Sequence, residues 1–64
     1  MNLFRKKKDC WFVSWITTTE NVMHIANGII YVEHGLSGTK LIHKLIEEVQ
    51  EMVPGATILD IAKL

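Results

Sequence analysis

Three histidines and one cysteine are the side chains of this chain best suited to bind a metal ion or to act as a nucleophile. His24, His34 and His43 fall in three different predicted elements, and Cys10 precedes them all. A metal site needs ligands that converge at a characteristic spacing, and these positions show no such spacing. We therefore expect no bound metal and no other cofactor.

Cys10 and His34 are the pair that would support nucleophilic catalysis, because a thiol needs an oriented base beside it. Whether they meet depends on how the segments that carry them pair. A cysteine at the start of a strand is more often a small packing residue, and a chain of 64 residues has little room for a catalytic pocket. We expect a protein that is not an enzyme.

Three glutamates place carboxylates on the exterior of a predicted helix: Glu47, Glu48 and Glu51. Carboxylates in water keep their ordinary acidity, so general acid–base chemistry is not expected of them. Glu47 and Glu51 are four residues apart and share one side of the helix. The group is either a solvated face or an acidic patch that contacts a basic partner.

Four of the seven cations stand together at the start of the chain: Arg5, Lys6, Lys7 and Lys8. The rest of the chain has three lysines against seven acids, a net charge of −4. We interpret residues 1–9 as a basic N-terminal leader and residues 10–64 as one domain. The leader, with Trp11 and Trp15, would suit nucleic acid because cations pair with phosphates and rings stack on bases. The acidic remainder opposes a broad nucleic-acid footprint.

Aromatic and β-branched residues predict a strand over residues 10–19, followed by a turn at Glu20–Asn21 and a second extended stretch over residues 22–34. Asn27–Gly28 is typical of a tight turn, which would split this stretch in two. Alternatively, Gly28 marks a bulge or a close approach of another backbone. We favour one long, kinked strand. Alternation gives the first strand two faces, one with Trp11, Val13 and Trp15 and the other with Phe12, Ser14 and Ile16.

Apolar residues recur every three or four positions between residues 41 and 53, which predicts an amphipathic helix. Ser37 is the predicted N-cap, and Pro54 ends the helix. Such a stripe must be buried, and the element available to bury it is a sheet face. The stripe contains Leu41, Ile42, Leu45, Ile46, Val49, Met52 and Val53.

Residues 56–64 predict a short last strand, so the chain is expected to form an α+β fold of the β-β-α-β type. The helical crossover places the last strand beside the first. This gives a small, mainly antiparallel sheet in the order 2-1-3, with one amphipathic helix packed on one face. The other face carries either the Trp11 set or the Phe12 set. Because large apolar patches are uncommon on monomers, we expect a homo-oligomer.

Three segments carry a pattern of hydrophobic positions that spans residues 11–64: 11–15, 24–33 and 57–64. The first has the form aromatic-x-Val-Ser-aromatic. The pattern resembles that of small phage and prophage accessory proteins, whose second strand has a Gly-Phe-Gly-Asn-like stretch and whose last strand resembles x-Ile-Leu-Asn-x-x-x-Leu. Both family glycines are missing here, and Asp60 stands where the family has Asn. The resemblance implies a viral origin and this fold.

By analogy with such proteins, we expect a non-enzymatic accessory protein that binds and modulates or inhibits a host protein, as in host takeover or anti-defence. The predicted partner-binding residues are Trp11, Val13, Trp15, Glu47, Glu48 and Glu51. The alternative is a small nucleic-acid-binding regulator that uses Arg5, Lys6, Lys7 and Lys8 with the strand tryptophans. No apolar run approaches the ~20 residues that span a bilayer, and no signal-peptide pattern is visible. We therefore expect a cytoplasmic location.

Overall fold

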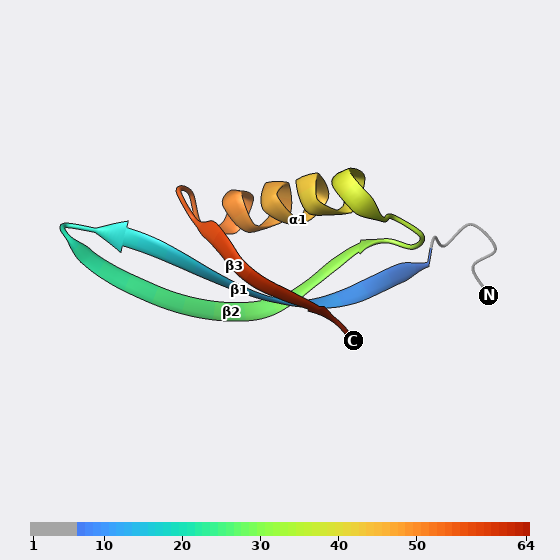
Figure 1. The fold of residues 1–64 in the computed structure, drawn as a ribbon, viewed down its shortest axis with the longest axis horizontal. Coiled ribbons are helices and arrows are strands. Elements are labelled where there is room, and N and C mark those ends of the chain that lie inside the picture. Colours follow the sequence, from blue (N-terminus) through green and yellow to red (C-terminus); the bar gives the residue numbers. More distant parts are fainter. Residues whose placement is uncertain (1–6) are drawn as a thin grey trace.

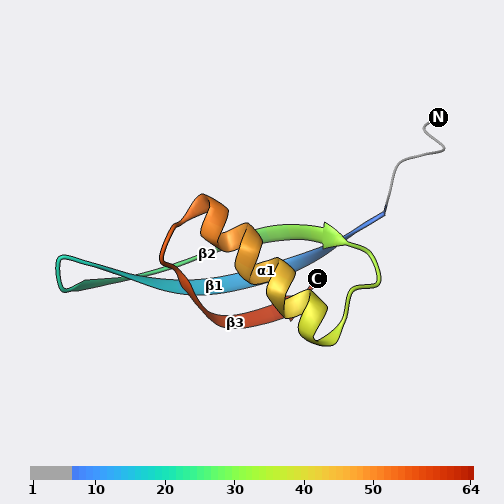
Figure 2. The same ribbon diagram turned by 90° about the horizontal axis from the view of Figure 1, so that it is seen from above.

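The computed structural model describes residues 7–64 as three strands and one helix. The elements are β1 (Lys8–Thr19), β2 (Val22–Glu33), α1 (Gly38–Met52) and β3 (Thr57–Lys63). The strands form one sheet in the order β2-β1-β3, and both neighbours of β1 run antiparallel to it. Helix α1 lies across one face of this sheet (Figure 1 and Figure 2). The predicted α+β fold, strand order and single covered face are confirmed.

The sheet includes the last two residues of the predicted leader. Strand β1 begins at Lys8, so Lys8 and Asp9 are part of the sheet. Arg5 and Lys6 of the predicted leader lie outside the described residues.

The β1–β2 hairpin keeps one register along its whole length, from Lys8 opposite Glu33 to Thr19 opposite Val22. Its turn is the predicted pair Glu20–Asn21, whose φ angles of 50° and 67° are both positive. Positive φ at both central residues is the signature of a type I′ turn, whose twist matches that of the strands it joins. The turn thus sets every cross-strand pair of the hairpin.

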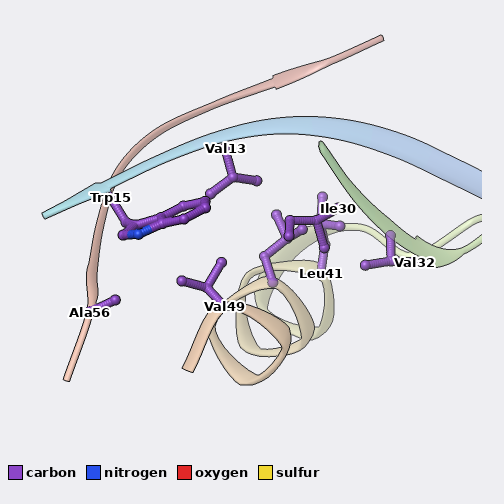
Figure 3. Packing of buried hydrophobic residues seen from close by; sticks show 8 residues of the cluster. Val13, Trp15, Ile30, Val32, Leu41, Val49 and Ala56 are labelled. Atoms are coloured by element: carbon purple, nitrogen blue, oxygen red, sulfur yellow. The ribbon is translucent and has the colours of Figure 1, made fainter. Parts of the chain in front are cut away.

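Gly28 lies inside β2, which continues through Asn27–Gly28 without a turn or a register shift. A Cβ atom on this glycine would sit 3.2 Å from Cη2 of Trp15. The approach that requires glycine is therefore made by an aromatic ring and not by another backbone. Figure 3 shows the Trp15 side chain on the side of the sheet that faces α1, with Val49 of the helix opposite it.

The core is a single layer of side chains between α1 and the sheet. The helix contributes residues four positions apart, so the buried strip is narrower than the predicted stripe: Ile42 and Met52 are exposed. A three-stranded sheet is too narrow to cover more of the helix. The core consists of Val13, Trp15, Ile30, Val32, Leu41, Leu45, Val49 and Ala56 (Figure 3).

A bulge in β3 brings two isoleucines that are three residues apart to the same face. The β1–β3 register shifts between Ser14 and Trp15, so that Leu59 has no directly opposite residue. Strict alternation would place Ile58 and Ile61 on opposite faces. The extra residue corrects this, and both side chains pack against the core.

The molecule is elongated because the β1–β2 hairpin extends beyond β3 and α1. It measures 49 × 24 × 17 Å. Its radius of gyration is 13.4 Å, against about 11 Å for a compact chain of this size. Strand β3 pairs with β1 only between Trp11 and Ile16. Beyond that point residues 17–24 project as a two-stranded ribbon, which we call the arm (Figure 1).

Candidate functional site

The tryptophan face of β1 is the face that α1 covers. Val13 is 0% and Trp15 is 7% exposed, and the half-buried Trp11 packs against the same cluster. This corrects the expectation that Val13 and Trp15 contact a partner, because their side chains are enclosed by α1 and the sheet. The same burial keeps the Trp15 ring from stacking on a base. The Nε1 atom of Trp11 is buried and has no hydrogen-bond partner among the described residues.

The opposite face of the sheet carries the Phe12 set, and no described element covers it. In this register Phe12 pairs with Ile29 and Ile16 pairs with Ile25, so their side chains share that face. Tyr31 lies one pair further along, opposite Cys10. The exposed fractions are 37% for Phe12, 70% for Ile25, 45% for Ile29 and 60% for Tyr31. We call these side chains, with Ile16, the open face.

A row of polar residues crosses the middle of the open face. Ser14 of β1 pairs with Asn27 of β2 on one side and with Asp60 of β3 on the other. Oδ1 of Asp60 accepts a hydrogen bond from the Ile61 N–H at 2.9 Å, which orients the carboxylate. The row separates the Phe12–Ile29 pair from the Ile16–Ile25 pair. Each of the three strand segments singled out in the sequence contributes one member of this row.

Comparisons of the chain with protein-family models, with curated proteins and with solved structures found no match.

Cys10 and His34, the pair that nucleophilic catalysis would need, are not brought together, since His34 contacts Asp9. Nδ1 of His34 lies 2.8 Å from Oδ1 of Asp9, while the Gly35 N–H donates to Oδ2 at 3.4 Å. Nζ of Lys63 lies 3.7 Å from the same carboxylate. Adjacent residues of a strand point to opposite faces, so the Cys10 thiol is directed away from this cluster.

The Asp9 cluster acts as a clamp. It joins the start of β1 to the loop after β2 and to the end of β3. The hydrogen bond from His34 holds the pKa of Asp9 below its ordinary value of 3.8, with help from Gly35 and Lys63 and against the opposing effect of burial. Sequence reasoning missed this cluster, although the two-residue turn already implies that His34 reaches the start of β1.

The acidic patch predicted on α1 is partly neutralised by Lys44. Its Nζ atom lies 3.6 Å from Glu47 and 3.5 Å from Glu48. These carboxylates, Glu47 foremost, raise the pKa of the Lys44 ammonium. Glu51 is exposed. Exposed ion pairs of this kind contribute little to stability, and Lys44 offsets only one of the three negative charges of the patch.

An open groove of about 300 Å³ separates α1 from β3. This volume is at the lower end of those that hold small ligands. The groove's amide donor is already in use, because Nε2 of Gln50 donates to the Ala56 carbonyl at 3.2 Å. Its lining consists of Ile42, Ile46, Gln50, Ala56, Thr57, Ile58 and Ile61.

No group of three or more His, Cys, Asp or Glu residues within residues 7–64 is placed to hold a metal ion. No helix in the described part of the chain is long and apolar enough to cross a membrane. Lys7 and Lys8, the two cations of the basic leader that lie within the described residues, are exposed at the base of the hairpin.

Proposed function

We propose that this protein is a non-enzymatic binding module whose open face contacts a partner protein. The observation that carries the proposal is a sheet face with large apolar side chains that no described residue covers. Large apolar side chains exposed together on one face are a usual mark of an interaction site. The polar row of Ser14, Asn27 and Asp60 would supply the oriented hydrogen bonds that typically accompany the apolar core of an interface.

The dimensions of the molecule suit such a role. A standard interface needs ~800 Å² from each partner. Helix α1 stacks on the sheet along the 24 Å axis of the molecule (Figure 1), so the open face extends over about 49 × 17 Å, which is close to that area. The groove beside α1 is smaller and the acidic patch is partly neutralised, so both are weaker candidates.

The partner class follows from the resemblance to phage accessory proteins. The proposal is a host protein that is modulated or inhibited when the open face covers part of it. A second copy of the chain is the other expected partner. The nucleic-acid alternative loses support, because Trp15, one of the two rings that would stack on bases, is buried.

Affinity capture from a bacterial lysate tests the proposal. The bait proteins are the wild type, a Phe12→Thr variant that removes the ring at the centre of the open face, and a Glu51→Gln control on the exposed side of α1. Circular dichroism first establishes that all three are folded. We expect a stoichiometric protein that the wild type and Glu51→Gln retain and that Phe12→Thr loses, with or without nuclease.

Two results would overturn the proposal. Equal capture by Phe12→Thr and the wild type would show that the open face is not the contact surface. Captured material that disappears on nuclease treatment would point to the nucleic-acid alternative instead.

A further inference from the structure

The outer edge of β2 offers a long row of unpaired backbone groups. The His34 N–H donates to the Lys7 carbonyl at 3.2 Å. This bond shows which residues of β2 direct their backbone groups toward β1. In an antiparallel pair every second residue directs its N–H and C=O toward the neighbour. The even-numbered residues of β2 therefore bond to β1, and the odd-numbered ones face outward. No strand within residues 7–64 pairs with them. The outward-facing residues are Met23, Ile25, Asn27, Ile29, Tyr31 and Glu33.

This edge lacks the features that protect exposed strands from pairing with another chain. Natural edges are protected by proline, by lysine, by bulges or by being short. Strand β2 has 12 residues, which corresponds to an edge of ~40 Å. It contains no proline, lysine or arginine, and its register with β1 has no bulge. An edge of this kind is a template for another strand.

We propose that a second copy of this chain pairs with this edge, β2 against β2, to form one continuous six-stranded sheet with a two-fold axis at Asn27. The commonest homo-oligomers are symmetric dimers, in which the same surface of both copies is buried. A two-fold axis normal to a sheet makes the two central strands antiparallel. The outward N–H and C=O of Asn27 would then bond to those of its counterpart.

The side chains of β2 favour this register. With the axis at Asn27, Ile25 lies opposite Ile29 of the second copy and Met23 lies opposite Tyr31. Both are apolar cross-strand pairs, and the second joins a thioether to an aromatic ring. On the helix side, Val22 lies opposite Val32 of the second copy.

Charge complementarity favours the same register. It places Glu20 opposite His34 of the second copy and Glu33 opposite Asn21, so no like charges meet. A register with its axis at Gly28 would place Glu33 opposite Met23. A carboxylate beside an apolar side chain in a paired strand is unfavourable, because burial penalises its charged form.

Pairing would also give the arm a neighbour. A two-stranded hairpin is marginally stable alone, and three strands are needed for independent stability. The arm exposes Val22 by 54% and Met23 by 68%. In the dimer, residues 22–24 of each arm lie beside residues 30–32 of the other copy. In that copy, α1 packs on this part of the sheet and forms the core with it. The open faces stay uncovered, so the dimer goes beyond the partner-binding role and does not depend on it.

Light scattering with two matched double variants tests the proposal. The wild type is expected to have twice the chain mass of 7.3 kDa at micromolar concentration. Ile25→Lys with Ile29→Lys places like charges opposite each other across the interface and should give a monomer. Ile25→Lys with Ile29→Glu makes the same number of changes but places opposite charges together, so it should remain a dimer.

A monomeric wild type would overturn the proposal. So would equal behaviour of the two double variants, because a dimer formed through the open faces would be disrupted by both. Phe12→Thr lies on the central strand and should leave the dimer intact, which separates a failure here from a failure of the partner-binding proposal.

A cysteine cross-link provides a second readout that does not depend on charged variants. In a Cys10→Ser background, Asn27→Cys would face its own counterpart at a Cα separation of ~5.5 Å, within disulfide range. Mild oxidation should give a covalent dimer. Ile25→Cys in the same background should stay monomeric on a denaturing gel, since its counterpart lies far along the strand. Equal cross-linking of the two variants would contradict the register.

Discussion

Gly28 shows how one residue resolves a choice that the sequence leaves open. Asn-Gly is a strong turn signal, yet the pair lies within a continuous strand. The reason is tertiary, since the ring of Trp15 occupies the space where a Cβ atom would be. Local propensity carries no information about a ring that arrives from the neighbouring strand.

Substitutions at Gly28 should therefore be destabilising in proportion to side-chain size. We expect Gly28→Ala to lower the free energy of unfolding by about 1 kcal/mol and Gly28→Val to lower it further, because Trp15 is enclosed by α1 and cannot easily move. Urea denaturation measures both. Valine has a higher strand propensity than glycine. A Gly28→Val variant as stable as the wild type would therefore show that the Trp15 ring moves aside and that strand propensity outweighs the steric clash.

Asp9 should make stability depend on pH at the acid end. Its folded pKa lies below the ordinary 3.8 because His34, Gly35 and Lys63 stabilise the carboxylate. The stabilisation is thus fully present above the unfolded pKa and is lost as the pH falls through the folded value. Urea denaturation of the wild type and Asp9→Asn should show a stability difference that is constant near neutrality and shrinks below about pH 4. A difference that stays constant down to pH 2 would contradict the clamp.

The sequence contains enough information to predict which residues of β1 and β2 pair, although we did not predict these pairs. Once Glu20–Asn21 is accepted as a two-residue turn, Thr19 pairs with Val22 and the remaining pairs follow by counting. That count places the His34 segment beside the start of β1. It does not reveal which face α1 covers, because both faces of β1 begin with aromatic and aliphatic side chains.

At the scale of elements, the strands, the helix and their order were predictable, while the width of the helix contact was not. The three- and four-residue spacing indicated seven buried positions, but α1 buries Leu41, Leu45 and Val49. The bulge at Leu59 was equally hidden, although two isoleucines three residues apart in a predicted strand were a signal of it. Sheet width and register are properties of several segments together.

The centre of the helix contact is the place where a single truncation should cost most. Leu45 is 0% exposed between α1 and the sheet. We expect Leu45→Ala to lower the free energy of unfolding by ~2–5 kcal/mol, enough to unfold a domain this small. His43→Ala, on the exposed side of the helix, should change it by less than ~0.5 kcal/mol. Thermal melting compares them, and equal shifts would mean that the helix is turned differently.

At the scale of the whole molecule, charge distinguishes the two classes of partner. Replacing Arg5, Lys6, Lys7 and Lys8 with Gln should leave binding to a protein partner largely unchanged, because solvated charges contribute little at ordinary salt. Binding measurements at two salt concentrations, for the partner and for an oligonucleotide, check this. Tight oligonucleotide binding by the wild type, with a salt slope that falls by about one unit for each lost contact in the variant, would favour the nucleic-acid alternative.

We propose that a protein partner covers the open face, and a photo-cross-linker at one position of that face tests this proposal most directly. Phe12 lies at the centre of that face on the middle strand, away from the β2 edge, whereas His43 lies on the exposed side of α1. A benzoylphenylalanine at Phe12 should, on irradiation in a bacterial lysate, form a covalent adduct with one protein larger than a second copy of the chain. The same group at His43 should form none. An adduct at His43 alone, or at neither position, would contradict the account.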